Sequence, residues 1–450
     1  MNNSYENLKS IFLLFIFSAV VALFIFSDDG AKYDYSVLST SYLICQIALL
    51  KIFRFSKYSF SLDNILNLFF IFFIGLAGAL QYKQDITFWG ALRDLNESDY
   101  LYGNIIMLSI LITYNLSYNL FLKKQVSDSS KVNIDFSLES VKTIQMILIL
   151  MSIVAVLIFA YSKNFNLNSI LFRGQYAEAE EGGGRLGGAL GLIVNIFVRP
   201  IPLVCLLIYK LVNYDRKTNI IVVLLLLSLT LFSNSPSGMP RFQAASLYIP
   251  LMLVYSSQLR NRFNFALFFC FGLLIVFPFL DQFRRSNEIR KGFSVNTEIF
   301  IQAHFDTFQN TVNVINSELI TYGKQLSGVV LFFVPRKVWP DKPIGSGAFV
   351  AKQNDYEFSN ISMCYFGEGY INFGFLGILM FTLLMAYVNA KFDFKFWESK
   401  SKSKNFVAFY LVFLGMEFFI LRGDLLSSFA YTIGIFLSIS VVYKFATFKR

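Results

Sequence analysis

The chain alternates between long apolar runs and short polar segments over almost its whole length. A helix that crosses about 30 Å of hydrocarbon needs roughly 20 mostly apolar residues, and inside a bilayer a helix satisfies all of its own backbone hydrogen bonds. The pattern therefore predicts an all-α polytopic membrane protein with about twelve transmembrane helices. The predicted spans are 10–27, 36–53, 64–82, 101–122, 143–161, 189–212, 218–233, 242–258, 263–280, 365–388, 405–421 and 426–446.

Lysine and arginine follow every second span, which sets the predicted orientation. The positive-inside rule places such loops in the cytoplasm, so both termini should be cytoplasmic. The alternate loops are acidic or mixed. The first span lacks a clear small-residue cleavage site and eleven more follow it, so we expect an anchor and not a cleaved signal peptide.

Composition supports the same class of protein. Of 450 residues, 55% are hydrophobic and 15% are charged, whereas a soluble domain has roughly 25% charged residues. One His and four Cys exclude a disulfide scaffold and a Cys/His metal protein. The net charge of +10 does not indicate nucleic acid as a partner, because the basic residues punctuate apolar runs and do not gather on one soluble face.

Two segments on the predicted outward side are long enough to carry function. The chain divides into 1–280, with nine spans and an outward loop at 162–188, a large outward loop at 281–364, and 365–450, with three spans. The apolar run 328–335 is too short to span and is expected to be re-entrant or docked at the interface.

Arginine on the outward side is not explained by the positive-inside rule. A guanidinium group binds phosphate oxygens through two parallel hydrogen bonds and stays charged, so a lipid-linked diphosphate is one candidate ligand. Salt bridges to the many outward acids are the alternative. The residues concerned are Arg173, Arg185, Arg241, Arg284, Arg285, Arg290, Arg336 and Arg422.

Three further positions could carry chemistry. Arg199 lies inside the sixth span and is either a functional group or the ion-pair partner of Glu417. His304, two residues before Asp306, is either a general base or a structural histidine. Glu368, between two glycines at the mouth of the tenth span, could activate a sugar hydroxyl or stabilise an oxocarbenium-like centre.

Several outward segments form an ordered series. They are Gly238-Met239-Pro240-Arg241, Asp306-Thr307-Phe308, the Pro- and Trp-containing stretch 333–343 with Gly345, Gly367-Glu368, Asn372-Phe373-Gly374 and Leu421-Arg422-Gly423-Asp424. A Pro…Trp-Pro…Lys-Pro segment late in a large outward loop, followed by a Gly-rich span start, resembles the Wzy-type oligosaccharide repeat-unit polymerases of O-antigen and capsule synthesis. The 173–188 segment does not match that family's Arg-to-Gly spacing, so no role is transferred to its arginines.

The resemblance implies a GT-C-like glycosyltransferase at the periplasmic face of the bacterial inner membrane. It implies that a growing glycan on undecaprenyl diphosphate is transferred to one lipid-linked repeat unit, and that the loop 281–364 is periplasmic. A chain-length regulator and a flippase are implied partners, besides membrane lipid. Neither a cofactor nor a metal is expected. The implied roles are diphosphate binding by Arg241, Arg284, Arg285, Arg336, Lys342 and Arg422, orientation or deprotonation of the acceptor by Asp306, His304 or Glu368, and sugar stacking by Trp339.

Other membrane proteins fit part of the pattern. A lipid-linked oligosaccharide flippase or another transporter fits twelve spans, but such proteins usually show two similar halves, and no half-repeat is visible here. An O-antigen ligase shares the architecture and a long periplasmic loop. A membrane O-acyltransferase needs a histidine within the membrane, and His304 is predicted outside it.

Overall fold

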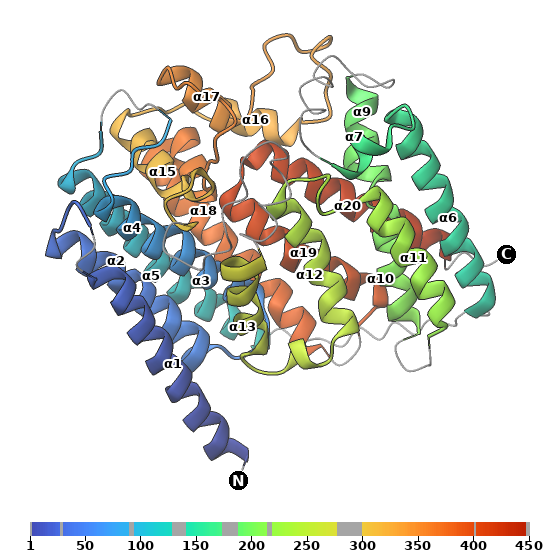
Figure 1. The fold of residues 1–450 in the computed structure, drawn as a ribbon, viewed down its shortest axis with the longest axis horizontal. Coiled ribbons are helices and arrows are strands. Elements are labelled where there is room, and N and C mark those ends of the chain that lie inside the picture. Colours follow the sequence, from blue (N-terminus) through green and yellow to red (C-terminus); the bar gives the residue numbers. More distant parts are fainter. Residues whose placement is uncertain are drawn as a thin grey trace.

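The computed structural model describes residues 2–27, 30–89, 94–127, 141–172, 188–213, 218–276, 299–399 and 402–446 (Figure 1). Within these ranges the regular structure is helical and no strand occurs. The N-terminal half contains α1 (Asn2–Phe26), α2 (Tyr35–Leu50), η1 (Lys51–Phe55), α3 (Leu62–Phe69), η2 (Phe70–Leu76), α4 (Ala77–Lys83), α5 (Glu97–Ser127), α6 (Val141–Ser162), α7 (Leu167–Leu171), α9 (Ala189–Ile193), η3 (Val194–Val198), α10 (Ile201–Val212) and α11 (Ile220–Ser233).

In the C-terminal half, a series of short helices lies between the longer helices α12 (Arg241–Tyr255) and α18 (Tyr365–Glu398). This half contains α12, η4 (Gln258–Arg260), α13 (Asn264–Phe271), η5 (Gly272–Val276), η7 (Ala303–Phe305), α15 (Thr307–Asn316), α16 (Lys324–Val330), α17 (Ser346–Gln353), α18, α19 (Lys404–Arg422) and α20 (Leu425–Ala446). The helices α15, α16 and α17 lie at the upper end of the bundle in Figure 1, and the N-terminus lies at the lower end.

The prediction of a multi-pass helical membrane protein is confirmed, but not the count of twelve. Nine helices in the described part of the chain are long and apolar enough to cross a membrane, and they match predicted spans one to six and ten to twelve. Spans seven to nine correspond to shorter apolar helices, Ile220–Ser233, Phe242–Tyr255 and Asn264–Ile275. At 1.5 Å per residue, 14 residues reach about 21 Å, which is less than the hydrocarbon thickness.

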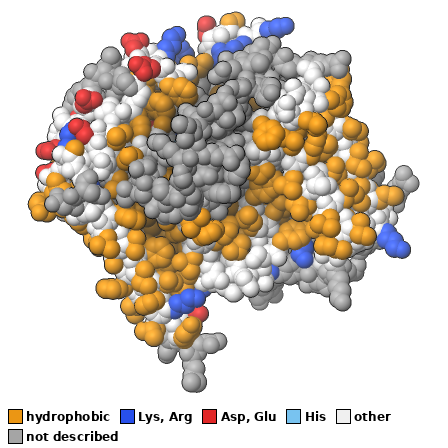
Figure 2. Space-filling view, viewed as in Figure 1, with side chains coloured by type: hydrophobic (Ala, Val, Ile, Leu, Met, Phe, Trp, Pro, Cys, Tyr) orange, Lys and Arg blue, Asp and Glu red, His pale blue; other side chains and the backbone are white. Residues whose placement is uncertain are grey.

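One membrane-length helix lies at the centre of the bundle. It is the continuous rod Leu62–Lys83, made of α3, η2 and α4, and all of its 18 most apolar consecutive residues are buried. In Tyr5–Phe26, only 17% of the corresponding 18 residues are buried. The other helices therefore surround the rod, and α1 lies at the periphery. Figure 2 shows apolar side chains in a broad band across one face, with acidic side chains mostly toward its upper edge and basic ones toward both its upper and lower edges, as expected for a surface that faces lipid.

The segment predicted as a large outward loop contributes a core helix in its described part. Eight of the ten residues of α15 are buried, and the helix packs against α18, α5, η2 and α4. Its buried face is unusually polar, and it includes Asp306 just before the helix, Gln309 and Asn310. Polar side chains at full burial must be hydrogen-bonded, so this helix brings a specific polar network to the upper end of the bundle.

A kink explains the Asn372-Phe373-Gly374 motif. Phe373 and Gly374 have non-helical backbone angles inside α18, and Gly374 has φ of 63°, a conformation that favours glycine. The freed backbone is used elsewhere, because Thr321 N–H donates to Ile371 O at 2.7 Å and Gly323 N–H to Asn372 O at 3.0 Å. The kink thus separates a short first segment, which carries Glu368, from the long membrane-crossing remainder.

Candidate functional site

The turn between α19 and α20 joins two polar clusters at the upper end of the bundle. Gly423 ends α19 by donating its N–H to Phe419 O at 2.8 Å. Asp424 then caps α20, since its carboxylate accepts from Ser427 N–H at 3.4 Å. Arg422, on one side of this turn, and Asp424, on the other, are thereby held in fixed and different directions.

Arg422 is the centre of the first cluster. Its Nη2 lies 3.6 Å from Asp306 Oδ1, and its Nε and Nη2 donate to the carbonyl oxygen of His304 at 3.3 and 2.9 Å. The guanidinium carbon stands 4.6 Å from the centre of the Phe242 ring. The Arg422 side chain is 17% exposed, so it is the member of this pair that solvent reaches.

Asp306 is saturated by donors. Its Oδ2 accepts from Trp89 Nε1 at 3.2 Å, Asn310 Nδ2 at 2.9 Å and Ser362 N–H at 3.2 Å, and its Oδ1 accepts from the Ser362 hydroxyl. Burial raises the pKa of the Asp306 carboxyl above its ordinary value, although Arg422 and the donors act in the opposite direction. With four hydrogen bonds and the Arg422 contact on its two oxygens, Asp306 is suited to orient Arg422.

A pair of carboxyl groups forms the second cluster. Glu368 accepts from Ser346 Oγ at 2.6 Å and from Leu425 N–H at 3.0 Å, and Asp424 accepts from Gly347 N–H at 3.0 Å. Because Ser346 and Gly347 are adjacent, as are Asp424 and Leu425, the two acids lie side by side. Burial raises the pKa of the Asp424 carboxyl. A proton shared within such a pair is a ready acid–base unit.

Gly345 has a steric reason to be glycine. A Cβ at this position would clash with the Asp424 carboxylate. The segment that follows the Pro-Trp-Pro stretch therefore wraps directly around the α19–α20 turn. Two motifs almost eighty residues apart in the sequence are in contact here.

Two of the predicted diphosphate ligands, Arg336 and Lys342, lie in the turn-containing segment 332–343, here called the hairpin, and bond to its backbone. Lys342 Nζ donates to the carbonyl oxygens of Phe332 and Val334 at 2.5 and 3.0 Å, and Arg336 Nη1 donates to Lys342 O at 2.8 Å. Burial and the charge of Arg336 lower the pKa of Lys342. Lys342 therefore closes the hairpin, while Arg336 remains exposed at its edge and Trp339 is half-buried.

Contacts between aromatic rings attach this hairpin to the site. The ring centroids of Phe332 and Phe429 of α20 are 6.2 Å apart, and α16, which precedes the hairpin, packs against α20 and α18. Val338 and Phe333 are 75% and 63% exposed. The run 328–335, predicted to be re-entrant or docked at the interface, thus ends beside exposed apolar side chains.

The remaining basic candidates are only partly within the described residues. Arg241 is the first residue of α12, and its neighbour Phe242 lies under Arg422, so the start of α12 adjoins the Arg422 cluster. The side chain of Arg241 lies outside the described part. Arg284 and Arg285 also lie outside the described residues, as do Arg173, Arg185 and Arg290.

Arg199 supports the loop in front of α12 and does not bind Glu417. Its Nε donates to Ser233 O at 2.8 Å and its Nη2 to Gly238 O at 3.4 Å, while its guanidinium lies 5.1 Å from the Phe159 ring centre. Glu417 bonds instead to Asn389. The alternative of an Arg199–Glu417 pair is therefore wrong, and Arg199 is a positioning residue for the Gly238–Arg241 motif.

Arg199→Lys is expected to destabilise the protein by about 1–3 kcal/mol, because a single Nζ cannot occupy both positions from which Nε and Nη2 reach Ser233 O and Gly238 O, and an ammonium has no planar face for the Phe159 ring. Thermal unfolding of the purified protein in detergent measures the change. Arg54→Lys, at an exposed guanidinium that contacts Asn7 at 3.4 Å, is the matched control. Equal unfolding temperatures for the two variants would contradict the role of Arg199 in positioning the loop before α12.

The sequence did not single out several residues that complete the site. Trp89 and Ser362 bind Asp306, and Ser346 binds Glu368. Nothing in the local sequence of these three residues distinguishes them. Asp424 had a signal, because it stands two residues after Arg422 in a polar break between two apolar runs. Within the described residues, no group of three or more His, Cys, Asp or Glu is placed to hold a metal ion.

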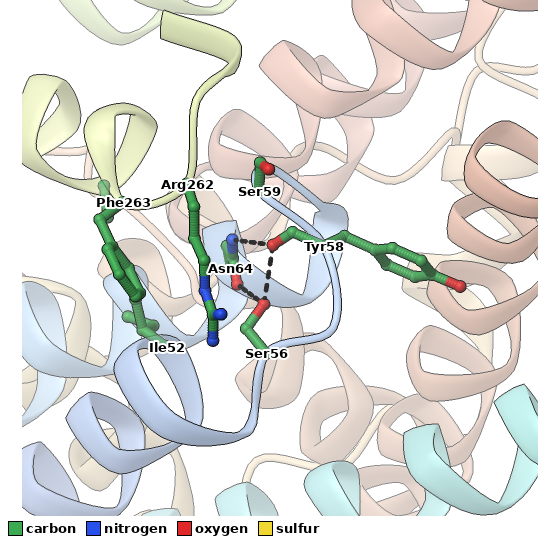
Figure 3. A pocket seen from close by; sticks show the side chains of 8 residues that line it. Ile52, Ser56, Tyr58, Ser59, Asn64, Arg262 and Phe263 are labelled. Atoms are coloured by element: carbon green, nitrogen blue, oxygen red, sulfur yellow. Dashed lines mark hydrogen bonds between the residues drawn. The ribbon is translucent and has the colours of Figure 1, made fainter. Parts of the chain in front are cut away.

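A small surface pocket lies elsewhere. Figure 3 shows Arg262 reaching toward Ser56 beside the hydrogen-bonded group Ser56, Tyr58 and Asn64. Tyr58 stacks on Trp397 with 5.4 Å between ring centroids, at the last turn of α18, whereas Glu368 is in its first turn. The pocket is thus at the opposite end of α18 from the two polar clusters.

Comparison with known proteins gives no relative: no family model, no curated protein and no solved structure matches the chain. The site is therefore interpreted from its own chemistry.

Proposed function

We propose that the protein is a glycosyltransferase of the periplasmic face of the bacterial inner membrane, which polymerises oligosaccharide repeat units carried on undecaprenyl diphosphate into O-antigen or capsular polysaccharide. The observation that carries the proposal is one turn, 422–425, that holds a braced arginine on one side and a buried carboxyl pair on the other. Anion binding beside an acid–base unit, at one end of a membrane helix bundle, suits a diphosphate leaving group and a hydroxyl acceptor.

In the proposed reaction, the acceptor hydroxyl oxygen forms a bond to the anomeric carbon of the growing glycan. The bond between that carbon and the diphosphate oxygen breaks, and the electron pair leaves with the undecaprenyl diphosphate. The hydroxyl proton passes to the Glu368–Asp424 pair. Ser346 Oγ occupies Glu368 Oε2, so an acceptor reaches this oxygen by taking the place of Ser346.

Arginine neutralises the charge that develops on the leaving diphosphate. Arg422 is oriented for this by Asp306 and by the His304 carbonyl oxygen, and we propose that Arg241 and Arg336, with Arg284 and Arg285, complete the binding site. Trp339 offers a ring face for a sugar. In this proposal Asp306 and the His304 backbone are positioning groups, and the proton acceptor is the carboxyl pair.

A gene deletion tests the proposal. Loss of the protein is expected to leave single repeat units on surface lipid in place of the long-chain ladder on a polysaccharide gel, and plasmid-borne wild type should restore the ladder. Complementation with Arg241→Ala should fail, whereas Arg262→Ala, at the opposite end of the bundle, should succeed at equal membrane abundance. A ladder restored by Arg241→Ala would contradict diphosphate binding at the start of α12.

A lipid-linked oligosaccharide transporter is the second candidate, and one observation favours it. Buried acids and a lysine within membrane helices are typical of transporters, and the helices that could cross a membrane carry Lys51–Asp63, Asp393 and Glu417 as such groups. The deletion separates the classes: loss of a flippase leaves no repeat unit on the surface, and loss of an O-antigen ligase leaves polymer made but unattached.

A further inference from the structure

A ladder of polar side chains links α5, α18 and α19 in the interior of the helix bundle. One rung contains Asn389 of α18, which donates to Tyr114 Oη of α5 at 2.9 Å and to Glu417 Oε1 of α19 at 2.5 Å. The next rung contains Asp393, one helical turn along α18, which accepts from Tyr118 Oη at 2.8 Å and Tyr410 Oη at 2.7 Å. The spacing i, i+4 on α18 and α5 aligns the two rungs.

Asp393 and Glu417 differ in the number of hydrogen bonds that they accept. Asp393 Oδ1 also accepts from Leu62 N–H at 3.0 Å, and its Oδ2 from Asp63 N–H at 3.4 Å. Four donors therefore satisfy Asp393 as a carboxylate. Glu417 has one donor, Asn389, and its Oε2 has no hydrogen-bond partner among the described residues. The Oδ1 of Asn389 is likewise unpaired within that part of the chain, and both residues are fully buried.

The charges around Glu417 do not favour a second anion. The nearby charged groups are Asp393 on α18 and Asp63 on α3, and Asp63 is paired with Lys51 at 3.4 Å. Three carboxylates against one ammonium would leave two uncompensated charges in an apolar interior, which is very costly. The other helices that pack against α19 carry their charged residues only at or near their ends, Arg241 on α12, Lys210 on α10 and Lys444 on α20.

We propose that Glu417 is a proton-binding site at membrane depth, in which the proton on the carboxyl group supplies the donor that Oε2 and Asn389 Oδ1 otherwise lack. A neutral acid removes one of the excess charges and leaves Asp393 as the ionised acid of the ladder. The site lies on the same helix as Arg422, five residues before it, and does not depend on the reaction that occurs at the α19–α20 turn.

Infrared spectroscopy of the purified full-length protein in detergent tests the site. We expect the carbonyl stretching band of a protonated, buried carboxylic acid at neutral pH, shifted in D2O and lost in Glu417→Gln. Glu417→Asp keeps the acid and should keep a displaced band. Glu398→Gln, at a half-exposed glutamate paired with Lys57 at 2.8 Å, should leave the band unchanged.

Two outcomes overturn the proposal. One is a difference spectrum, wild type minus Glu417→Gln, that contains no carboxylic acid band; any band of the Glu368–Asp424 pair cancels in that difference. The other is thermal stabilisation of the wild type by sodium chloride, absent with choline chloride and absent in Glu417→Gln, which would assign a metal cation to the unpaired oxygens. Should Glu417→Gln not fold, the displaced band of Glu417→Asp decides. None of these measurements requires glycosyl transfer, so they stand or fall apart from the proposed function.

Discussion

Arg422→Ala is expected to abolish the long-chain polysaccharide ladder, and Arg422→Lys to reduce it severely. The guanidinium spans two acceptors, the Asp306 carboxylate at 3.6 Å and the His304 carbonyl at 2.9 and 3.3 Å, while its face lies over Phe242. A lysine keeps the charge but cannot keep this planar arrangement. Loss of one preorganised group at a developing charge typically costs about 10²–10³-fold in rate.

The measurement is a polysaccharide gel of the deletion strain complemented with each variant, scored at equal protein abundance in membranes. Arg336→Ala is the informative comparison, because Arg336 is exposed and its Nη1 bonds to the hairpin backbone, so a partial defect is expected. Arg262→Lys, in the pocket at the other end of α18, is the neutral control. A full ladder with Arg422→Ala would remove Arg422 from the reaction and leave it a structural role only.

The apolar pattern predicted the fold class because span length and hydrophobicity are local properties. The count of twelve complete spans is not confirmed, since runs such as 218–233 are apolar enough but form a helix of only 14 residues. The apolar pattern could not show the burial of α15 either. The apolar face of α15 repeats at helical spacing as in any amphipathic surface helix, and only the packed structure shows that its polar residues, such as Gln309 and Asn310, are also enclosed.

The candidate site was predictable where a residue was unusual for its place. An arginine and an acid in the break between two apolar runs, or a glutamate between glycines, stand out against a lipid-facing background. The bonding of Asp306 was not predictable, because it depends on Trp89 and Ser362, which come from distant segments. The same holds for Arg199 and Glu417: the sequence shows two charges inside spans, and only the helix positions show that each binds a different partner.

The largest effect on stability is expected for Asp306→Ala, at about 3–5 kcal/mol. The change removes the acceptor of four hydrogen bonds, from Trp89, Asn310 and Ser362, and leaves the guanidinium of Arg422 without its counter-charge. Breaking one half of a buried ion pair is costly mainly because the other half remains. Thermal unfolding in detergent, followed by loss of the monodisperse peak, measures the shift.

The double variant Asp306→Ala/Arg422→Ala separates this explanation from a general packing defect. Removing Arg422 as well eliminates the unpaired charge, so the double variant should be less destabilised than the sum of the two single variants by about 1–3 kcal/mol. Asp341→Ala, on the exposed hairpin, should change stability by less than about 0.5 kcal/mol. Strict additivity of Asp306→Ala and Arg422→Ala would mean that the 3.6 Å contact contributes no coupling, and that Asp306 stabilises the α15 end through Trp89, Asn310 and Ser362 alone.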